Sequence, residues 1–331
     1  MAGATLDKDL FYNIDGGPWN GNNLSIYRGD STICGKVTYG NRSLKLSVYE
    51  GAHLTLRGGV SDADASRGGY FYVQPNAGGT VVFTNTPVSL AAPLYVSPYN
   101  GLDANGFAGY IVFAVAGNRM PQLGYVTSKE NYKLRNCKMM TTVDWAFDNA
   151  SQKMVVGENA VWDLCGTSQR VGNLDVVLSS GTMPVITNSS ESAATLYLNQ
   201  TANSTPQALF AGRLSVDFSG NFTTTIDHAM TAEGGVAVNS GTLAFTSSGS
   251  WRNATSISAS GGGRLTVAGP RAFGRNVDVA LESDSSLEIA SGVTLRAKSL
   301  SVGGVKRSNG KYAFGDGWLL VGPQGMLFIL K

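Results

Sequence analysis

Apolar residues recur along this chain in short alternating triplets at a fixed interval. The clearest are Leu243-Ala244-Phe245, Leu265-Thr266-Val267 and Leu287-Glu288-Ile289, whose first residues are 22 positions apart. An apolar-polar-apolar triplet is typical of a short strand with alternate side chains pointing inward. A constant interval of about 20 to 50 residues indicates stacked structural repeats. The pattern therefore predicts an all-β solenoid in which one repeat is one coil.

The same triplet occurs earlier in the chain. Leu174-Asp175-Val176 and Leu196-Tyr197-Leu198 are also 22 residues apart, and we interpret them as two more coils. Leu214-Ser215-Val216 lies off this interval, which we attribute to loops of different length.

Turn residues divide the rest of the chain. Strand triplets separated by Gly40-Asn41 and Gly51-Ala52 over 21–60 predict the first coils or an amino-terminal cap. Residues 91–150 are richer in proline and aromatic residues and predict an irregular or inserted segment with long loops. We expect an amino-terminal region with this insertion over 1–150, and regular coils with a carboxy-terminal cap over 151–331.

Composition agrees with a β-rich extracellular protein. Glycine contributes 42 of 331 residues, above the usual ~7%, and charged residues contribute 15%, below the usual ~25%. The net charge of +2 gives no clustered basic surface, so we expect no nucleic-acid partner. No apolar run is long enough to span a membrane. The first seven residues lack a signal-peptide pattern, so secretion would require a leader outside this sequence.

The three cysteines are too few and too far apart for a disulfide framework or a zinc site. Cys34, Cys137 and Cys165 are expected to be small buried apolar side chains, with a Cys137–Cys165 bridge as the alternative.

Two stretches resemble the repeats of bacterial autotransporter passenger domains. Residues 161–174, VWDLCGTSQRVGNL, are similar to the coil "x-L-D-L-N-G-x-x-Q-x-V-G-x-L", and residues 234–245, GGVAVNSGTLAF, are similar to "G-G-x-x-V-x-x-G-T-L-x-F". The resemblance covers roughly half of the chain. It implies a right-handed parallel β-helix at a bacterial surface. In the first stretch Cys165 replaces the asparagine of a tight turn, so that coil is expected to be tied differently.

Catalytic chemistry has little support. Of the two histidines, His53 is expected to face solvent, and His228 follows Asp227 in what we interpret as a strand, where neighbours point to opposite faces. Asp62 with Asp64, and Asp144 with Asp148, could form acid-base pairs or bind calcium, but turn-forming roles are the simpler interpretation. We expect no catalytic residue, no metal and no cofactor.

Aromatic residues are the best binding candidates, because exposed rings stack on sugars or partner surfaces. Those in loop-like segments are Trp19, Tyr95, Tyr99, Phe107, Tyr110, Tyr125 and Tyr132. We select Tyr95, Tyr99, Phe107 and Tyr110 as candidate ligand-binding residues, with packing beneath the insertion as the alternative.

Together these features predict a non-catalytic extracellular β-helix of a bacterial surface or secreted protein. It would act in adhesion to glycans or a host-surface partner, or as a structural stalk. The alternative is a carbohydrate-active β-helix enzyme, either a polysaccharide lyase or a glycoside hydrolase.

Replacement of Leu265 by Asp tests the solenoid itself. The substitution should unfold the neighbouring coils, because a lone carboxylate in an apolar stack has no partner. Thermal melting measures the effect, and an unchanged transition would show that Leu265 is not an interior residue.

Overall fold

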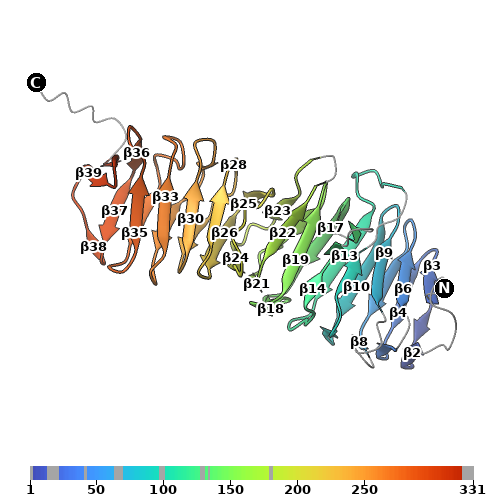
Figure 1. Cartoon of the computed structure of the whole chain (residues 1–331). Coiled ribbons are helices and arrows are strands. Elements are labelled where there is room, and N and C mark those ends of the chain that lie inside the picture. Colours follow the sequence, from blue (N-terminus) through green and yellow to red (C-terminus); the bar gives the residue numbers. More distant parts are fainter. Residues whose placement is uncertain are drawn as a thin grey trace, which may run out of the picture. The chain divides into compact units, whose positions relative to one another are not determined.

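The computed structural model describes residues 3–12, 22–40, 43–62, 70–96, 101–126, 131–132, 135–178 and 182–322. Over these residues the chain is all-β without a helix and winds as a parallel β-solenoid of about 12 turns (Figure 1). None of the described segments is a helix that could cross a membrane. The chain divides into two compact units, Met1–Ser189 and Ser190–Lys331, which are described separately.

The first unit has three parallel sheets, and in its early coils each turn of the chain adds one strand to each sheet. The first sheet contains β1 (Thr5–Leu6), β4 (Asp30–Ile33), β7 (His53–Leu56), β10 (Gly79–Thr84), β13 (Gly109–Ala114), β17 (Cys137–Thr141), β20 (Val161–Asp163) and β23 (Val185–Asn188). The second contains β2 (Leu10–Tyr12), β5 (Val37–Tyr39), β8 (Val60–Asp62) and β11 (Val88–Ser89). The third contains β3 (Asn22–Ile26), β6 (Leu44–Val48), β9 (Phe71–Pro75), β12 (Leu94–Val96), β14 (Gln122–Leu123), β19 (Lys153–Gly157) and β22 (Leu174–Val177). Two short pairs are additional: antiparallel β15 (Tyr125–Val126) with β16 (Asn131–Tyr132), and parallel β18 (Asp148–Asn149) with β21 (Gln169–Val171).

The second unit repeats the arrangement with shorter coils. Its longest ladder contains β24 (Ala194–Asn199), β26 (Leu214–Ser219), β29 (Gly235–Val238), β32 (Ser256–Ala259), β34 (Asp278–Leu281) and β37 (Ser299–Val302). A second contains β27 (Thr223–Ile226), β30 (Thr242–Phe245), β33 (Arg264–Val267) and β35 (Ser286–Ile289). The third face contains β25 (Leu209–Gly212), β28 (Ala229–Met230) and β31 (Ser250–Trp251).

Two antiparallel hairpins end the second unit. β37 pairs with β38 (Val305–Lys306), and β39 (Gly310–Phe314) pairs with β40 (Gly317–Val321), which also adds to β36 (Thr294–Ala297). A hairpin reverses the chain and stops the addition of parallel coils, so this end of the unit is closed by a change of strand direction.

The clearest predicted triplets stack as expected. Leu243, Leu265 and Leu287 are register partners on β30, β33 and β35, and each is at most 5% exposed. The stacking of the 22-residue repeat is therefore confirmed, and Leu265 is an interior residue.

The earlier triplets follow a different register. Leu174 lies in β22, which pairs with β19, whereas Leu196 lies in β24, which pairs with β26, so these two triplets are not register partners of each other. On β24 and β26, Leu196 is opposite Val216, a step of 20 residues. The off-interval Leu214 is opposite Ala194, because strands can shift a triplet by two residues and keep the same face inward.

Coils in the first unit lengthen before and within residues 91–150, the segment that the sequence predicted to be irregular. The steps are 27 residues from Leu54 to Val81, 30 from Val81 to Ile111 and 28 from Ile111 to Met139. Strands β13, β14 and β17 of this segment still belong to the ladders, and the β15–β16 hairpin is an addition to them. The boundary expected between residues 150 and 151 remains a prediction.

Large aromatic side chains fill the bore of the first unit. Phe83, Phe113, Phe147 and Trp162 are at most 1% exposed, and successive ring centroids lie 5.0, 4.8 and 6.2 Å apart. Full burial of a side chain of this size contributes roughly 1.5–3 kcal/mol.

Buried amide side chains tie the turns of adjacent coils together. Asn118 accepts a hydrogen bond from the Val88 amide (2.9 Å) and donates to the carbonyls of Val115 (2.7 Å) and Ala146 (2.9 Å). Gln169 is fully buried and accepts from the Phe147 amide (2.9 Å). These side chains supply partners for backbone groups that the strand ladders leave unpaired.

Cys165 occupies a left-handed turn, with φ of 49°. Asparagine tolerates this conformation better than other non-glycine residues, and Asn85, Asn136 and Asn159 adopt it elsewhere in the chain. The turn is held by hydrogen bonds from the Cys165 amide to Asp163 Oδ1 (3.1 Å) and from its thiol to the Asp163 carbonyl (3.6 Å). The asparagine that the resemblance expects here suits the backbone, and cysteine adopts the same turn at a conformational cost.

We predict that Cys165→Asn raises the free energy of unfolding by about 1 kcal/mol, because it relieves a left-handed residue that costs roughly 1–2 kcal/mol. Chemical denaturation measures the gain. Cys34→Asn is the control, since Cys34 is also a free cysteine but does not have positive φ, and it should give no gain. Equal effects at both positions would contradict the explanation.

Candidate carbohydrate-binding surface

The outer face of the third sheet carries a group of tyrosines. In β6, Leu44, Leu46 and Val48 are buried and point into the bore, so Lys45 and Ser47 point outward. Parallel register then fixes what lies beside them on the neighbouring strands.

The register forms two rows of outward residues. Lys45 is opposite Tyr72 of β9, which is opposite Tyr95 of β12. Ser25 of β3 is opposite Ser47, and Tyr27 and Tyr49 follow two residues later, just beyond the ends of β3 and β6. We call Tyr27, Tyr49, Tyr70, Tyr72 and Tyr95 the tyrosine face; its two groups are separated by roughly 13 Å at 3.3 Å per residue along a strand.

The rings form two clusters. Tyr27 and Tyr49 stack with centroids 4.6 Å apart and planes at 13°. Tyr95 lies 4.9 Å from both Tyr70 and Tyr72. Tyr27, Tyr49 and Tyr70 are 62%, 36% and 39% exposed, whereas Tyr95 is only 4% exposed. The exposed rings can contact a ligand, and the buried Tyr95 packs against Tyr70 and Tyr72.

An exposed aromatic cluster can bind a sugar because the apolar ring packs on the sugar face while the hydroxyl remains a hydrogen-bond group.

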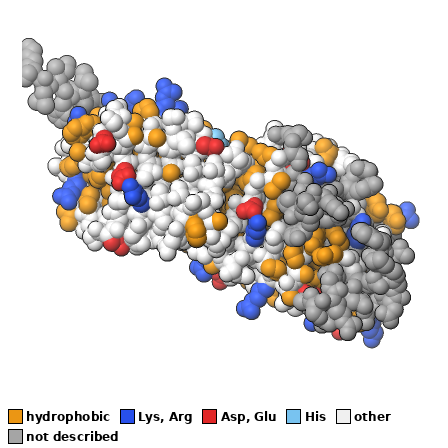
Figure 2. Space-filling view, in the orientation of Figure 1, with side chains coloured by type: hydrophobic (Ala, Val, Ile, Leu, Met, Phe, Trp, Pro, Cys, Tyr) orange, Lys and Arg blue, Asp and Glu red, His pale blue; other side chains and the backbone are white. Residues whose placement is uncertain are grey.

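Between the two clusters, Ser47 donates a hydrogen bond to Gln74 Oε1 at 3.1 Å, and both side chains are buried. Hydrophobic side chains are more frequent over the first unit than over the second in the face that Figure 2 shows.

The structure separates the residues selected from sequence. Tyr95 joins Tyr70 and Tyr72, whereas Phe107 and Tyr110 belong to the segment around β13 in the first sheet and contact each other at 5.8 Å. Tyr99 and Trp19 lie outside the described residues, as do the side chains of Tyr125 and Tyr132. A binding role for Tyr95, Tyr99, Phe107 and Tyr110 remains a prediction.

The Tyr110 hydroxyl is used within its own loop. It donates to Asp103 Oδ2 at 2.6 Å, and Asp103 also accepts from the amides of Asn105 and Phe107 at 2.9 Å. The Tyr110 hydrogen bond is the main cause that lowers the pKa of the Asp103 carboxyl below its usual value. This loop is therefore held by its own polar groups.

Sequence reasoning missed the most exposed members of the tyrosine face. The signal was a repeated tetrapeptide: Leu24-Ser25-Ile26-Tyr27 and Leu46-Ser47-Val48-Tyr49 are 22 residues apart. The interior positions of this repeat predict strands, and its outward tyrosines recur at the same interval.

The acidic candidates have partners within the chain. Asp62 accepts from the amides of Ala91 (2.8 Å) and Ala92 (3.3 Å), Asp144 accepts from the Ser168 amide (2.7 Å), and Asp148 pairs with Arg170 (3.0 Å). Each contact ties one coil to the next. Asp64 lies outside the described residues. Among the described residues no group of three His, Cys, Asp or Glu could hold a metal ion.

His228 and Asp227 do form a pair, contrary to our expectation. β27 ends at Ile226, so the two residues lie in a turn, where neighbouring side chains can meet. His228 Nδ1 lies 2.7 Å from Asp227 Oδ1, and Nε2 lies 3.1 Å from the Ala208 carbonyl oxygen. Both ring nitrogens thus lie within hydrogen-bond distance of oxygen atoms of the chain itself.

The three cysteines are free thiols. Burial raises the pKa of Cys137 to about 12, and burial together with the Asp163 charge raises that of Cys165 to about 11. A thiol with a high pKa is a poor nucleophile, so neither of these two side chains suggests covalent catalysis.

Asp163 is the most buried carboxylate of the described residues with an ion-pair partner, at 1% exposure. It pairs with Lys138 Nζ at 2.9 Å and accepts from the Ser189 amide (3.0 Å) and hydroxyl (2.6 Å). Burial alone would raise its pKa, but the hydrogen bonds from Ser189 and Lys138 outweigh that effect and lower it. Asp163 thus joins three successive coils.

Comparisons of the chain with protein-family models, curated proteins and solved structures find no match. The parallel β-solenoid rests on the coordinates, and any activity must be argued from this chain's own residues.

We predict that Asp163→Asn lowers the free energy of unfolding at pH 7 by about 3 kcal/mol, because it leaves Lys138 without its partner. The lowered pKa means that this contribution is present above about pH 4 and is lost as the pH falls through the folded-state value. Denaturant titrations at pH 7 and pH 3 should therefore show a smaller difference from the native chain at pH 3.

Asp175→Asn is the matched control, because Asp175 pairs with Lys153 at 2.5 Å on the surface. An exposed pair contributes at most about 1 kcal/mol. Similar losses for the two variants would show that burial of Asp163 has no energetic role.

Proposed function

We propose that this chain is a non-catalytic extracellular β-solenoid of a bacterial surface or secreted protein, and that its tyrosine face binds glycans. The observation that carries the proposal is the exposed Tyr27–Tyr49 stack, in which adjacent coils present rings at 4.6 Å. Large rings left in solvent at repeated positions have an energetic cost unless a ligand covers them.

The sequence pattern of the repeats supports the extracellular location. Residues 161–174 and 234–245 resemble the coils of autotransporter passenger domains, and those proteins act outside the cell. The low charge content and the abundance of Gly, Ser, Thr and Asn fit the same setting. A surface adhesin or a stalk with an adhesive face are both consistent with such a coil.

The candidate catalytic groups are bonded to other residues of the chain, and this supports a non-catalytic role. Asp62, Asp144 and Asp148 each hold a neighbouring coil, and His228 has acceptors at both nitrogens. A general acid or base must reach a substrate proton, whereas these side chains form hydrogen bonds or ion pairs with other residues of the chain.

A glycan array combined with a polysaccharide-cleavage screen tests the proposal. We expect binding without depolymerisation, and a loss of affinity of about fivefold or more in Tyr27→Ala/Tyr49→Ala, since two ring contacts contribute about 0.5–1.5 kcal/mol each. Phe11→Ala is the control, because Phe11 is also 62% exposed but lies on the second sheet.

Two results would contradict the proposal. Equal affinities of the double variant and the native chain would exclude the tyrosine face. Depolymerisation that disappears in Asp62→Ala or Asp144→Ala would show that the chain is an enzyme.

A further inference from the structure

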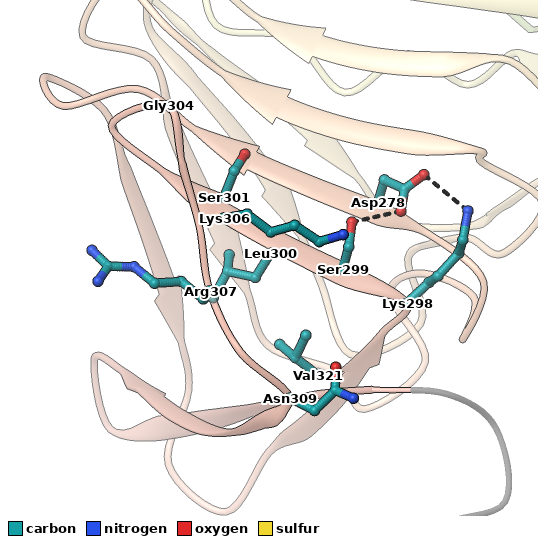
Figure 3. A pocket seen from close by; sticks show the side chains of 10 residues that line it. All are labelled: Asp278, Lys298, Ser299, Leu300, Ser301, Gly304, Lys306, Arg307, Asn309 and Val321. Carbon is teal, nitrogen blue, oxygen red and sulfur yellow. Dashed lines mark hydrogen bonds and ion pairs between the residues drawn. The ribbon is translucent and has the colours of Figure 1, made fainter.

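A basic pocket lies in the second unit, beside the hairpins that close it. Its walls come from four parts of the chain: the start of β34, the segment 298–301, the β37–β38 hairpin with the residues that follow it, and the end of β40. Figure 3 shows these side chains around a common opening. The space is about 470 Å³, within the 300–1,000 Å³ typical of small-ligand sites.

Positive charge dominates the lining. Lys298, Lys306 and Arg307 carry three charges, and Asp278 is the one carboxylate among the residues that line the pocket. Asp278 contacts Lys298 Nζ at 3.4 Å and accepts from the Ser299 hydroxyl at 2.6 Å. The Ser299 hydrogen bond, helped by the charges of Lys298 and Lys306, lowers the pKa of Asp278, so it is ionised at neutral pH.

Two charges remain in excess after this pairing. Lys306 and Arg307 are exposed, and neither forms an ion pair with a described carboxylate within 4 Å. In Figure 3 the Lys306 ammonium is directed toward Ser299, whereas the Arg307 guanidinium points away from Ser299. An anion at the opening would therefore meet the Lys306 ammonium, while the Arg307 guanidinium adds positive charge to the rim.

The backbone holds these cations in place. Ser301 is the antiparallel partner of Lys306, and the Arg307 amide donates to the Leu300 carbonyl at 2.8 Å. Gly303 and Gly304, with φ of 57° and 75°, form the tight turn between the two strands. A two-residue hairpin of this kind loses little entropy when a ligand binds, because its backbone is already fixed.

The remaining lining suits a sugar that carries the anion. Leu300 and Val321 are 1% and 7% exposed and provide an apolar floor. Ser301 and Asn309 add a hydroxyl and an amide at the rim. An apolar floor with a few polar groups and a cationic rim matches a ring with hydroxyls and one negative group.

We infer that this pocket binds the carboxylate or sulfate group of an acidic polysaccharide. The inference rests on the proposed glycan-binding function and adds a second site. The pocket belongs to the second unit, whereas the tyrosine face belongs to the first. The charge is local and the whole chain has a net charge of only +2, which favours one anionic group over the continuous phosphate backbone of a nucleic acid.

Isothermal titration of the full chain with oligogalacturonate, chondroitin sulfate oligosaccharides and a DNA duplex tests the inference. We expect Lys306→Gln/Arg307→Gln to lower the affinity for the acidic oligosaccharides at least tenfold, and Lys306→Arg to retain it. Arg252→Gln/Arg271→Gln removes the same charge from exposed positions elsewhere in this unit and should change the affinity less than twofold.

The pH distinguishes the two anionic groups. Binding of a carboxylated oligosaccharide should be lost below about pH 3.5 as the ligand protonates, while binding of a sulfated one should persist. Equal losses in both double variants, no binding of either acidic oligosaccharide, or a DNA affinity equal to theirs would overturn the inference.

Failure of this inference and failure of the proposed function give different results. If the pocket variant has no effect but Tyr27→Ala/Tyr49→Ala abolishes glycan binding, the pocket is excluded and the tyrosine face stands. If acidic oligosaccharides depend on the pocket and the tyrosine variant changes nothing, the tyrosine face is excluded.

Discussion

Backbone hydrogen bonding between successive coils determines where every other group of this protein lies. Parallel strands pair in register at about 4.8 Å, so a residue in one coil stands directly above its equivalent in the coil below. The buried column Leu243, Leu265 and Leu287 is the simplest result. Apolar side chains can fill the bore only if each coil returns to the same register, whatever the length of the turns between its strands.

The same register acts on the outer surface. Outward residues also stand above one another, so like side chains form ladders and opposite charges form pairs across coils. Tyr27 stacks on Tyr49, Lys153 pairs with Asp175, and Arg264 pairs with Glu288. A surface cluster in a solenoid thus comes from residues about 20 to 30 positions apart, and the repeat itself produces it.

The turns and the ends are where this protein departs from repetition. Buried Asn118, Gln169 and Asp163 bond to backbone groups of other coils, and they compensate for polar atoms that strands do not pair. At the end of the second unit, two antiparallel hairpins stop the coil. The reversal brings Lys306 and Arg307 to the same pocket as Lys298, with Asp278 as the one carboxylate in its lining.

The 22-residue interval, the alternating triplets and the frequent turns determined the all-β solenoid, because stacked parallel strands are the arrangement that buries one face of every short strand. The sequence also contains the outward repeat of Tyr27 and Tyr49. Three features depended on tertiary structure: the 20-residue register of β24 on β26, the pairing of His228 with Asp227 in a turn, and the basic pocket. Each depends on where a strand stops or on which strand lies beside it. Repeat spacing fixes the inward face of a strand, but turn geometry and chain reversal decide which outward side chains meet, because these contacts join residues that no local pattern relates.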